Sequence, residues 1–118
     1  MKFGLIGAGC IGQLRAKALA QVDGCVLSAI VDVDPARARA MASSPDVKIF
    51  QDVQEMLPQA NVDAVIVSTP PQFLEGLVLS AFKAGKHVLC EKPLANTVEA
   101  CRRMVDAARA SGKVLATG

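Results

Sequence analysis

KFGLIGAGCIG, residues 2–12, joins a short apolar run to three glycines in the spacing G-x-G-x-x-G. The apolar run, Lys2–Ile6, predicts a buried strand, and the residues around and after Gly12 carry apolar side chains at helical spacing. The stretch therefore predicts a strand that turns through glycines directly into a helix. This arrangement is typical of the first turn of a doubly wound α/β sheet.

Each glycine of this motif has a physical role in binding a pyrophosphate. Gly7 permits a tight turn, Gly9 has no side chain to keep a phosphate away from the backbone, and Gly12 lets the helix pack closely on the strand. The backbone N–H groups of Cys10 and Ile11 lie at the helix start, where unpaired donors and the helix dipole attract anions. The motif alone is weak evidence, but its place between a strand and a helix predicts a dinucleotide site.

Short apolar runs alternate with longer helical patterns along the rest of the chain. Strands are expected at 2–6, 25–31, 47–50, 63–68, 87–90 and 113–116, and helices at 11–22, 36–42, 53–59, 72–84 and 97–110. Regular alternation of this kind implies parallel strands joined by right-handed crossovers. We therefore predict one α/β domain over residues 1–118, a Rossmann fold whose six-stranded sheet has the order 3-2-1-4-5-6.

An acidic residue follows the second expected strand, about 20 residues after the glycine motif, as dinucleotide sites require. Asp32 is placed to accept hydrogen bonds from the hydroxyls of an adenosine ribose, and its charge repels a 2′-phosphate. Val33 adjoins it in the same loop. Arg37 lies further along, where it can either meet a 2′-phosphate or be solvated on an exposed helix face. The sequence thus favours NAD as the cofactor and leaves NADP open.

Two more polar stretches follow buried strands and are expected at the same carboxyl edge of the sheet. Ser68, Thr69 and Pro70 come after the fourth strand, where ligands bind in such folds, although an ordinary strand-to-helix turn would also use them. Glu91 and Lys92 come after the fifth strand. A lysine there can donate a hydrogen bond or a proton to a substrate oxygen, and the alternative is a solvated ion pair in a loop.

Composition excludes several classes of function. The formal net charge is +2, with no run of like charges, which gives no basis for nucleic-acid or membrane binding. The start of the chain does not resemble a secretory signal, and no apolar run reaches the ~18 residues that span a bilayer. Cys10, Cys25, Cys90 and Cys101 form no C-x-x-C pair, so we expect free thiols, no metal site and, by default, a cytoplasmic location.

Four stretches resemble the glucose–fructose oxidoreductase / inositol dehydrogenase (Gfo/Idh/MocA) family. They are GLIGAGCIG at 4–12, DVDPARA at 32–38, NVDAVIVSTPP at 61–71 and AGKHVLCEKPLANT at 84–97, and the last is the most specific. The resemblance covers the whole chain. It implies an NAD(P)-dependent oxidoreductase, often acting on a sugar or polyol hydroxyl. It also implies that Lys92 contacts the reacting hydroxyl and that Glu91 lies near the nicotinamide ribose.

The chain departs from the family pattern in two ways. Family members often carry T-P-N-x-x-H after the fourth strand, but Pro71 and Leu74 stand at the asparagine and histidine positions here. The family's second domain, which holds the substrate, has no counterpart in these residues. His87 is no substitute for the missing histidine, because it falls inside a strand pattern and is expected to be structural.

The leading interpretation is the cofactor-binding domain of a dehydrogenase whose substrate domain is supplied elsewhere. The alternative is a dinucleotide sensor or regulatory module without catalysis, and a following coding region for a sheet domain would distinguish the two. A methyltransferase of the same fold is disfavoured by the Glu-Lys-Pro run.

Because an uncovered sheet edge invites self-association, we also expect a homo-oligomer, which sedimentation equilibrium tests.

Overall fold

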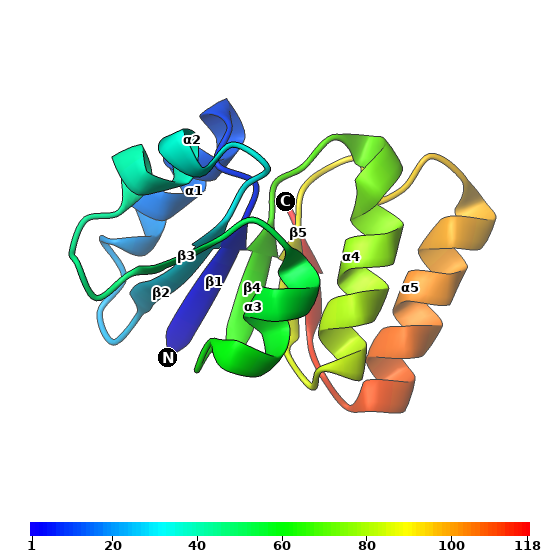
Figure 1. Cartoon of the computed structure of the whole chain (residues 1–118). Coiled ribbons are helices and arrows are strands. Elements are labelled where there is room, and N and C mark those ends of the chain that lie inside the picture. Colours follow the sequence, from blue (N-terminus) through cyan, green and yellow to red (C-terminus); the bar gives the residue numbers. More distant parts are fainter.

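The computed structural model describes every residue from Met1 to Gly118 and contains a single six-stranded sheet (Figure 1). The strands are β1 (Lys2–Ile6), β2 (Val26–Val31), β3 (Lys48–Phe50), β4 (Ala64–Val67), β5 (His87–Cys90) and β6 (Leu115–Thr117). The helices are α1 (Cys10–Leu19), α2 (Pro35–Met41), α3 (Val53–Gln59), α4 (Pro71–Lys83) and α5 (Val98–Ser111). All neighbouring strands are parallel, and their order, β3-β2-β1-β4-β5-β6, confirms the prediction.

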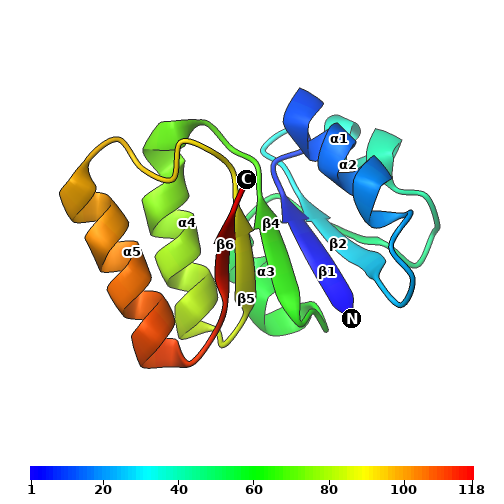
Figure 2. The same ribbon diagram turned by 180° about the vertical axis from the view of Figure 1, so that it is seen from behind.

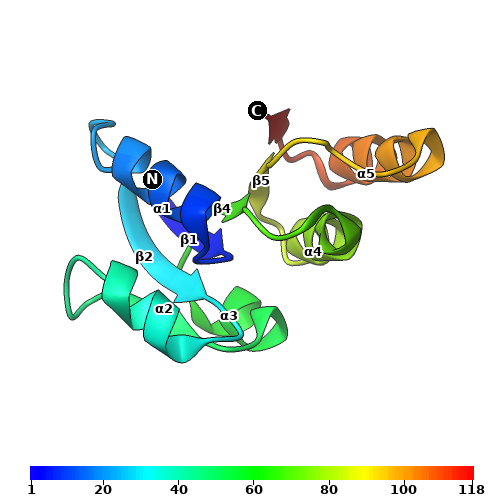
Figure 3. The ribbon, with the colours of Figure 1, turned by 90° about the horizontal axis from the view of Figure 1, so that it is seen from above.

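Helices cover both faces of the sheet. Viewed from above, α1 and α2 lie on one side of the twisted sheet, and α3, α4 and α5 lie on the other (Figure 3). Successive strand residues point to opposite faces, so Leu5 belongs to the core under α1 and α2, whereas Ile6 belongs to the larger core under the other three helices. Every residue of β4 is buried, as expected for a central parallel strand that is covered on both faces.

Two element boundaries differ from the predicted ones by two or three residues, and local hydrogen bonds explain both; the others differ by at most one residue. α1 ends at Leu19 rather than at Val22, because Gln21 and Val22 donate to carbonyls three residues back and form turns. The sixth strand starts at Leu115 rather than at Lys113. The Lys113 amide donates to the end of α5, and the Val114 amide donates to Nδ1 of His87 at 3.1 Å. His87 is thus structural, as predicted, although it is half-buried.

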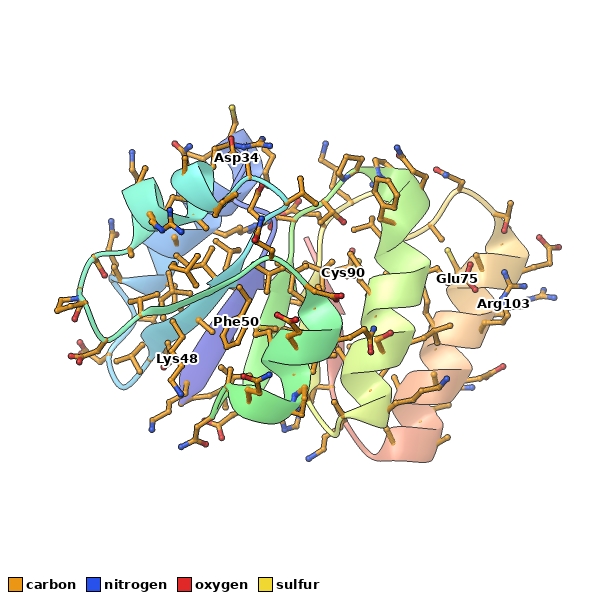
Figure 4. All side chains as sticks on the ribbon, in the orientation of Figure 1. Asp34, Lys48, Phe50, Glu75, Cys90 and Arg103 are labelled. Atoms are coloured by element: carbon orange, nitrogen blue, oxygen red, sulfur yellow. The ribbon has the colours of Figure 1, made fainter.

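The helices α4 and α5 run side by side along one face of the β4–β5–β6 half of the sheet, seen from behind in Figure 2. An ion pair joins them on the outer surface, where Arg103 Nε lies 2.5 Å from Glu75 Oε1 (Figure 4). The hydrogen bond from Arg103 lowers the pKa of Glu75. None of the five helices has the length and apolar character needed to cross a membrane.

Candidate functional site

The register of the central strands brings the predicted loops together at the carboxyl edge of the sheet. Ile6 at the end of β1 pairs with Val31 of β2 on one side and with Val67 of β4 on the other. Val67 in turn pairs with Cys90 of β5. The residues that follow these strand ends are therefore neighbours, in the spatial order Asp32, Gly7, Ser68 and Glu91.

The glycine motif packs tightly at two of its positions and is open at the third. Gly7 has φ +98°, and a Cβ there would lie 2.7 Å from the carbonyl oxygen of Ser68. A Cβ on Gly12 would lie only 2.0 Å from the carbonyl oxygen of Gly7. A Cβ on Gly9, in contrast, would meet no atom within 4 Å. The space that side chains leave at Gly9 is the space a pyrophosphate needs to reach the backbone.

The start of α1 faces this open space. Gly9 is the N-cap residue, and no side chain accepts a hydrogen bond from the first turn of the helix. The first N–H groups of a helix have no intrahelical partner, and together with the helix dipole they attract an anion. Cys10 and Ile11 supply such groups and are both exposed. This part of the site can hold phosphate oxygens without any charged side chain.

Asp32 is nearly buried beside the glycine turn, with 8% of its surface exposed. Its Oδ2 accepts a hydrogen bond from the backbone N–H of Ala8 at 2.7 Å, and its Oδ1 accepts one from the N–H of Asp34 at 2.8 Å. These bonds fix the carboxylate at the end of β2. Val33, the next residue, is 82% exposed, so its side chain is available to a ligand.

Arg37 of α2 turns back toward Asp32, and its side chain stays half exposed. Its Nη2 lies 3.3 Å from Asp32 Oδ1, and its Nε lies 3.4 Å from Asp34 Oδ2. The sequence left a phosphate contact and a solvated position as alternatives for this side chain. The structure places its guanidinium near two carboxylates on a half-exposed helix face, which leaves the phosphate contact a prediction.

Two hydroxyl groups after β4 have no hydrogen-bond partner in the protein although they are buried. They are Ser68 Oγ and Thr69 Oγ1, and both residues have other atoms close to Gly7. A buried hydroxyl without a partner costs about 1–3 kcal/mol, so these groups fit a site whose ligand supplies the partners. Pro70 caps α4 directly after them. We call the open space at Gly9 and the start of α1 the glycine cradle. This cradle and the unpaired hydroxyls together fit a nicotinamide dinucleotide.

A crevice of about 590 Å³ opens beside these residues, between the carboxyl edge of the sheet and the helices α3 and α4. Gly7, Asp32, Val33 and Thr69 line it, as the sequence led us to expect of one binding site. Its other lining residues were not predicted: Ile6, Val31, Gln51, Asp52, Val53, Gln54, Gln72, Phe73, Gly76, Leu77 and Ser80. Gln51 and Asp52 follow β3, so the rule about carboxyl strand ends would have identified them.

Glu91 and Lys92 lie outside this crevice and differ from each other in environment. Glu91 is 7% exposed, and its Oε1 is paired with Nε of Arg15 on α1. This hydrogen bond raises the pKa of Arg15. Arg15 Nη2 also donates to the carbonyl oxygen of Gly118 at 2.6 Å. Lys92 is exposed, and the peptide bond that joins it to Pro93 is cis. The sequence had not indicated Arg15 as a partner of this loop.

Cys90, at the end of β5, has a side chain with no exposed surface. Burial raises the pKa of its thiol to about 11, and the charges of Glu91 and Cys101 act in the same direction. The stabilisation from keeping this thiol neutral is complete below pH ~9 and is lost as the pH rises toward 11, because only the unfolded chain then ionises readily. We expect the free energy of unfolding to fall by up to about 2–3 kcal/mol over this range.

Urea unfolding of the wild type and of Cys90→Ala at pH 8 to 11 checks this expectation. The variant should lose less stability across the range, and Cys25→Ala, at a half-buried cysteine, should behave like the wild type. Equal losses in all three proteins would contradict the assignment of the effect to Cys90.

Comparisons with known proteins agree with this geometry. A family model described as "Oxidoreductase family, NAD-binding Rossmann fold" matches residues 1–118. Inositol 2-dehydrogenase from Paracoccus denitrificans is 42% identical over 118 residues, which cover 98% of this chain and 35% of that protein. A probable dehydrogenase from Thermotoga maritima has a TM-score of 0.92 and 37% identity, with 100% of this chain covering 36% of that one.

A second solved structure was determined with bound ligands. It is the WlbA dehydrogenase from Bordetella pertussis, in complex with NADH and UDP-GlcNAcA, with a TM-score of 0.94 and 33% sequence identity. The match covers 100% of this chain and 34% of the WlbA chain. The chain thus spans about one third of the length of these relatives. Because the family model covers every residue, and the fold and the motifs agree with it, the chain belongs to the Gfo/Idh/MocA oxidoreductase family and forms its NAD-binding Rossmann domain.

Proposed function

We propose that this chain is the cofactor domain of a dehydrogenase and holds NAD(H) across the carboxyl edge of its sheet. The observation that carries the proposal is the open cradle at Gly9, flanked by the carboxylate of Asp32 and by two unpaired buried hydroxyls. A dinucleotide has a pyrophosphate between two riboses. The pyrophosphate would fill the open space at Gly9, one ribose would lie at Asp32, and the other half would lie near the hydroxyls of Ser68 and Thr69.

Within this proposal the glycine loop and the start of α1 bind the pyrophosphate. Gly7, Gly9 and Gly12 shape the turn, and the N–H groups of Cys10 and Ile11 point at the phosphates. Asp32 accepts hydrogen bonds from the adenosine ribose. The adenine would occupy the crevice, where the exposed Val33 and the 55% exposed Phe73 offer apolar surface. The buried charge of Asp32 favours NAD over NADP.

The loops after β4 and β5 would hold the nicotinamide half. Ser68, Thr69 and Pro70 border the path between the two halves, and the hydroxyls of Ser68 and Thr69 can bond the cofactor. Glu91, fixed by Arg15, would lie near the nicotinamide ribose. The bound nicotinamide supplies the hydride acceptor. Lys92 would donate a hydrogen bond to the reacting hydroxyl oxygen and exchange a proton with it.

The substrate class proposed is a sugar or polyol. This follows from the relatives, whose names include inositol 2-dehydrogenase and whose ligands include UDP-GlcNAcA. Since the chain spans about one third of their length, we propose that a separate substrate domain completes the intact enzyme. Self-association through the edge strand β6, where Ala116 and Thr117 are exposed, remains a prediction.

Asp32→Ala should weaken NAD binding by roughly 10- to 100-fold, because a charged ribose contact contributes ~1.5–3 kcal/mol. Titration calorimetry of the 118-residue chain with NAD and NADP measures the effect. Asp23→Ala, which removes an exposed carboxylate in a distant turn, is the control and should bind as the wild type does. Thermal unfolding must accompany the titration, since Asp32 also holds the N–H groups of Ala8 and Asp34. Equal or tighter binding of NADP by the wild type would refute the NAD preference.

A further inference from the structure

The side chain of Asp34 makes two different contacts at the start of α2, near the top of Figure 4. Its Oδ1 accepts a hydrogen bond from the N–H of Ala36 at 2.9 Å and so caps the helix. Its Oδ2 lies 3.4 Å from Nε of Arg37. The same guanidinium reaches Asp32 Oδ1 through Nη2, at 3.3 Å. One cation is therefore shared between two carboxylates, and only one of these, Asp32, lines the crevice.

The charge of this cluster bears on how it would treat a phosphate. Asp32, Asp34 and Arg37 together carry a formal charge of −1, so they repel a dianionic group next to the ribose that Asp32 faces. The side chain of Arg37 is nevertheless flexible and 52% exposed. Guanidinium groups pair readily with phosphate oxygens, so Arg37 would be a phosphate ligand if the carboxylates released it.

We propose that Asp34 is a specificity-determining residue, which rejects a 2′-phosphate by holding the guanidinium of Arg37 on the carboxylate pair. The proposal rests on the proposed function, because it places the adenosine ribose beside Asp32. It goes beyond the role of Asp32, since Asp34 need not touch NAD at all. In this view the guanidinium of Arg37 could bind a phosphate, but its ion pair with the carboxylate of Asp34 prevents this.

The test uses two fragments that differ only at the 2′ position, 5′-AMP and adenosine 2′,5′-bisphosphate, titrated into the 118-residue chain by calorimetry. Asp34→Asn keeps a side-chain oxygen for the helix cap but removes the charge and the ion pair. We expect it to tighten binding of the bisphosphate by about tenfold, as one freed charge-assisted contact would. Binding of 5′-AMP should change by much less.

Arg37→Gln tells whether the gain comes through Arg37. It should cost the bisphosphate more affinity in the Asp34→Asn background than in the wild type, and the double variant should lose the tenfold gain. Arg39→Gln is the matched control, because Arg39 is an exposed arginine on the same helix that takes part in no ion pair. It should leave both affinities unchanged in either background.

The outcomes separate this inference from the proposed function. If the wild type binds neither NADH nor 5′-AMP, the proposed function fails and the inference with it. If the wild type binds both but Asp34→Asn tightens neither fragment, or tightens both equally, the inference alone is overturned. Equal costs of Arg37→Gln in the two backgrounds would also overturn it, since Arg37 and Asp34 would then act independently.

Discussion

A Gly12→Ala variant is expected to lose about 2–4 kcal/mol of unfolding free energy, a large part of the ~5–15 kcal/mol of a typical domain. The new Cβ would lie 2.0 Å from the carbonyl oxygen of Gly7, and that atom belongs to the backbone. α1 must therefore move away from β1, which disturbs the packing of Leu5. Alanine gains only ~1 kcal/mol in helix propensity, so the clash dominates. Urea unfolding followed by circular dichroism measures the loss.

Two other glycines provide controls for the same substitution. A Cβ on Gly76, within α4, or on Gly9 would meet no atom within 4 Å. Gly76→Ala should therefore raise the unfolding free energy by about 0.5–1 kcal/mol. Gly9→Ala should leave stability nearly unchanged but weaken NADH binding, because the methyl group would project into the phosphate cradle. If Gly12→Ala is as stable as the wild type, this result would contradict the close packing of α1 on the glycine turn.

The 118-residue chain should show no useful dehydrogenase turnover, although it binds NAD and carries Lys92. Positioning a substrate carbon against the nicotinamide contributes ~7–11 kcal/mol, or roughly 10⁵- to 10⁸-fold in rate. Lys92 is exposed and has no partner in the chain that would hold it toward a substrate oxygen. Leu74, which stands where family members often have histidine, is fully buried in the core. Leu74 therefore cannot supply the proton donor that a histidine at this position would.

Reduction of NAD, followed by absorbance with a panel of polyols and sugars, tests this expectation. The wild-type chain is compared with Lys92→Ala and with Lys83→Ala, a control at an exposed lysine of α4. Turnover above background that only Lys92→Ala abolishes would show that these residues form a complete enzyme. It would also rule out the alternative of a sensor without catalysis.

The sequence by itself determined the architecture and the edge of the sheet at which the candidate site lies. Alternating apolar runs and helical patterns imply parallel strands, and the G-x-G-x-x-G spacing after Lys2–Ile6 marks the strand at which the strand order reverses. Parallel strands place all their carboxyl ends at one edge, so the sequence alone groups Asp32, Ser68 and Glu91. These inferences succeed because hydrophobic periodicity and glycine conformation are local properties.

Only the tertiary structure decided which polar groups pair with each other. Arg15 pairs with Glu91 across the fold, and Arg37 turns back onto two carboxylates, Asp32 and Asp34. The i,i+3 spacing favours the Arg37–Asp34 contact, but no spacing predicts the contacts of Arg15 with Glu91 or of Arg37 with Asp32, because a long charged side chain can reach several partners from one backbone position. Which partner it meets depends on strand register, helix rotation and the burial of the carboxylate, and these are fixed only when the helices pack on the sheet.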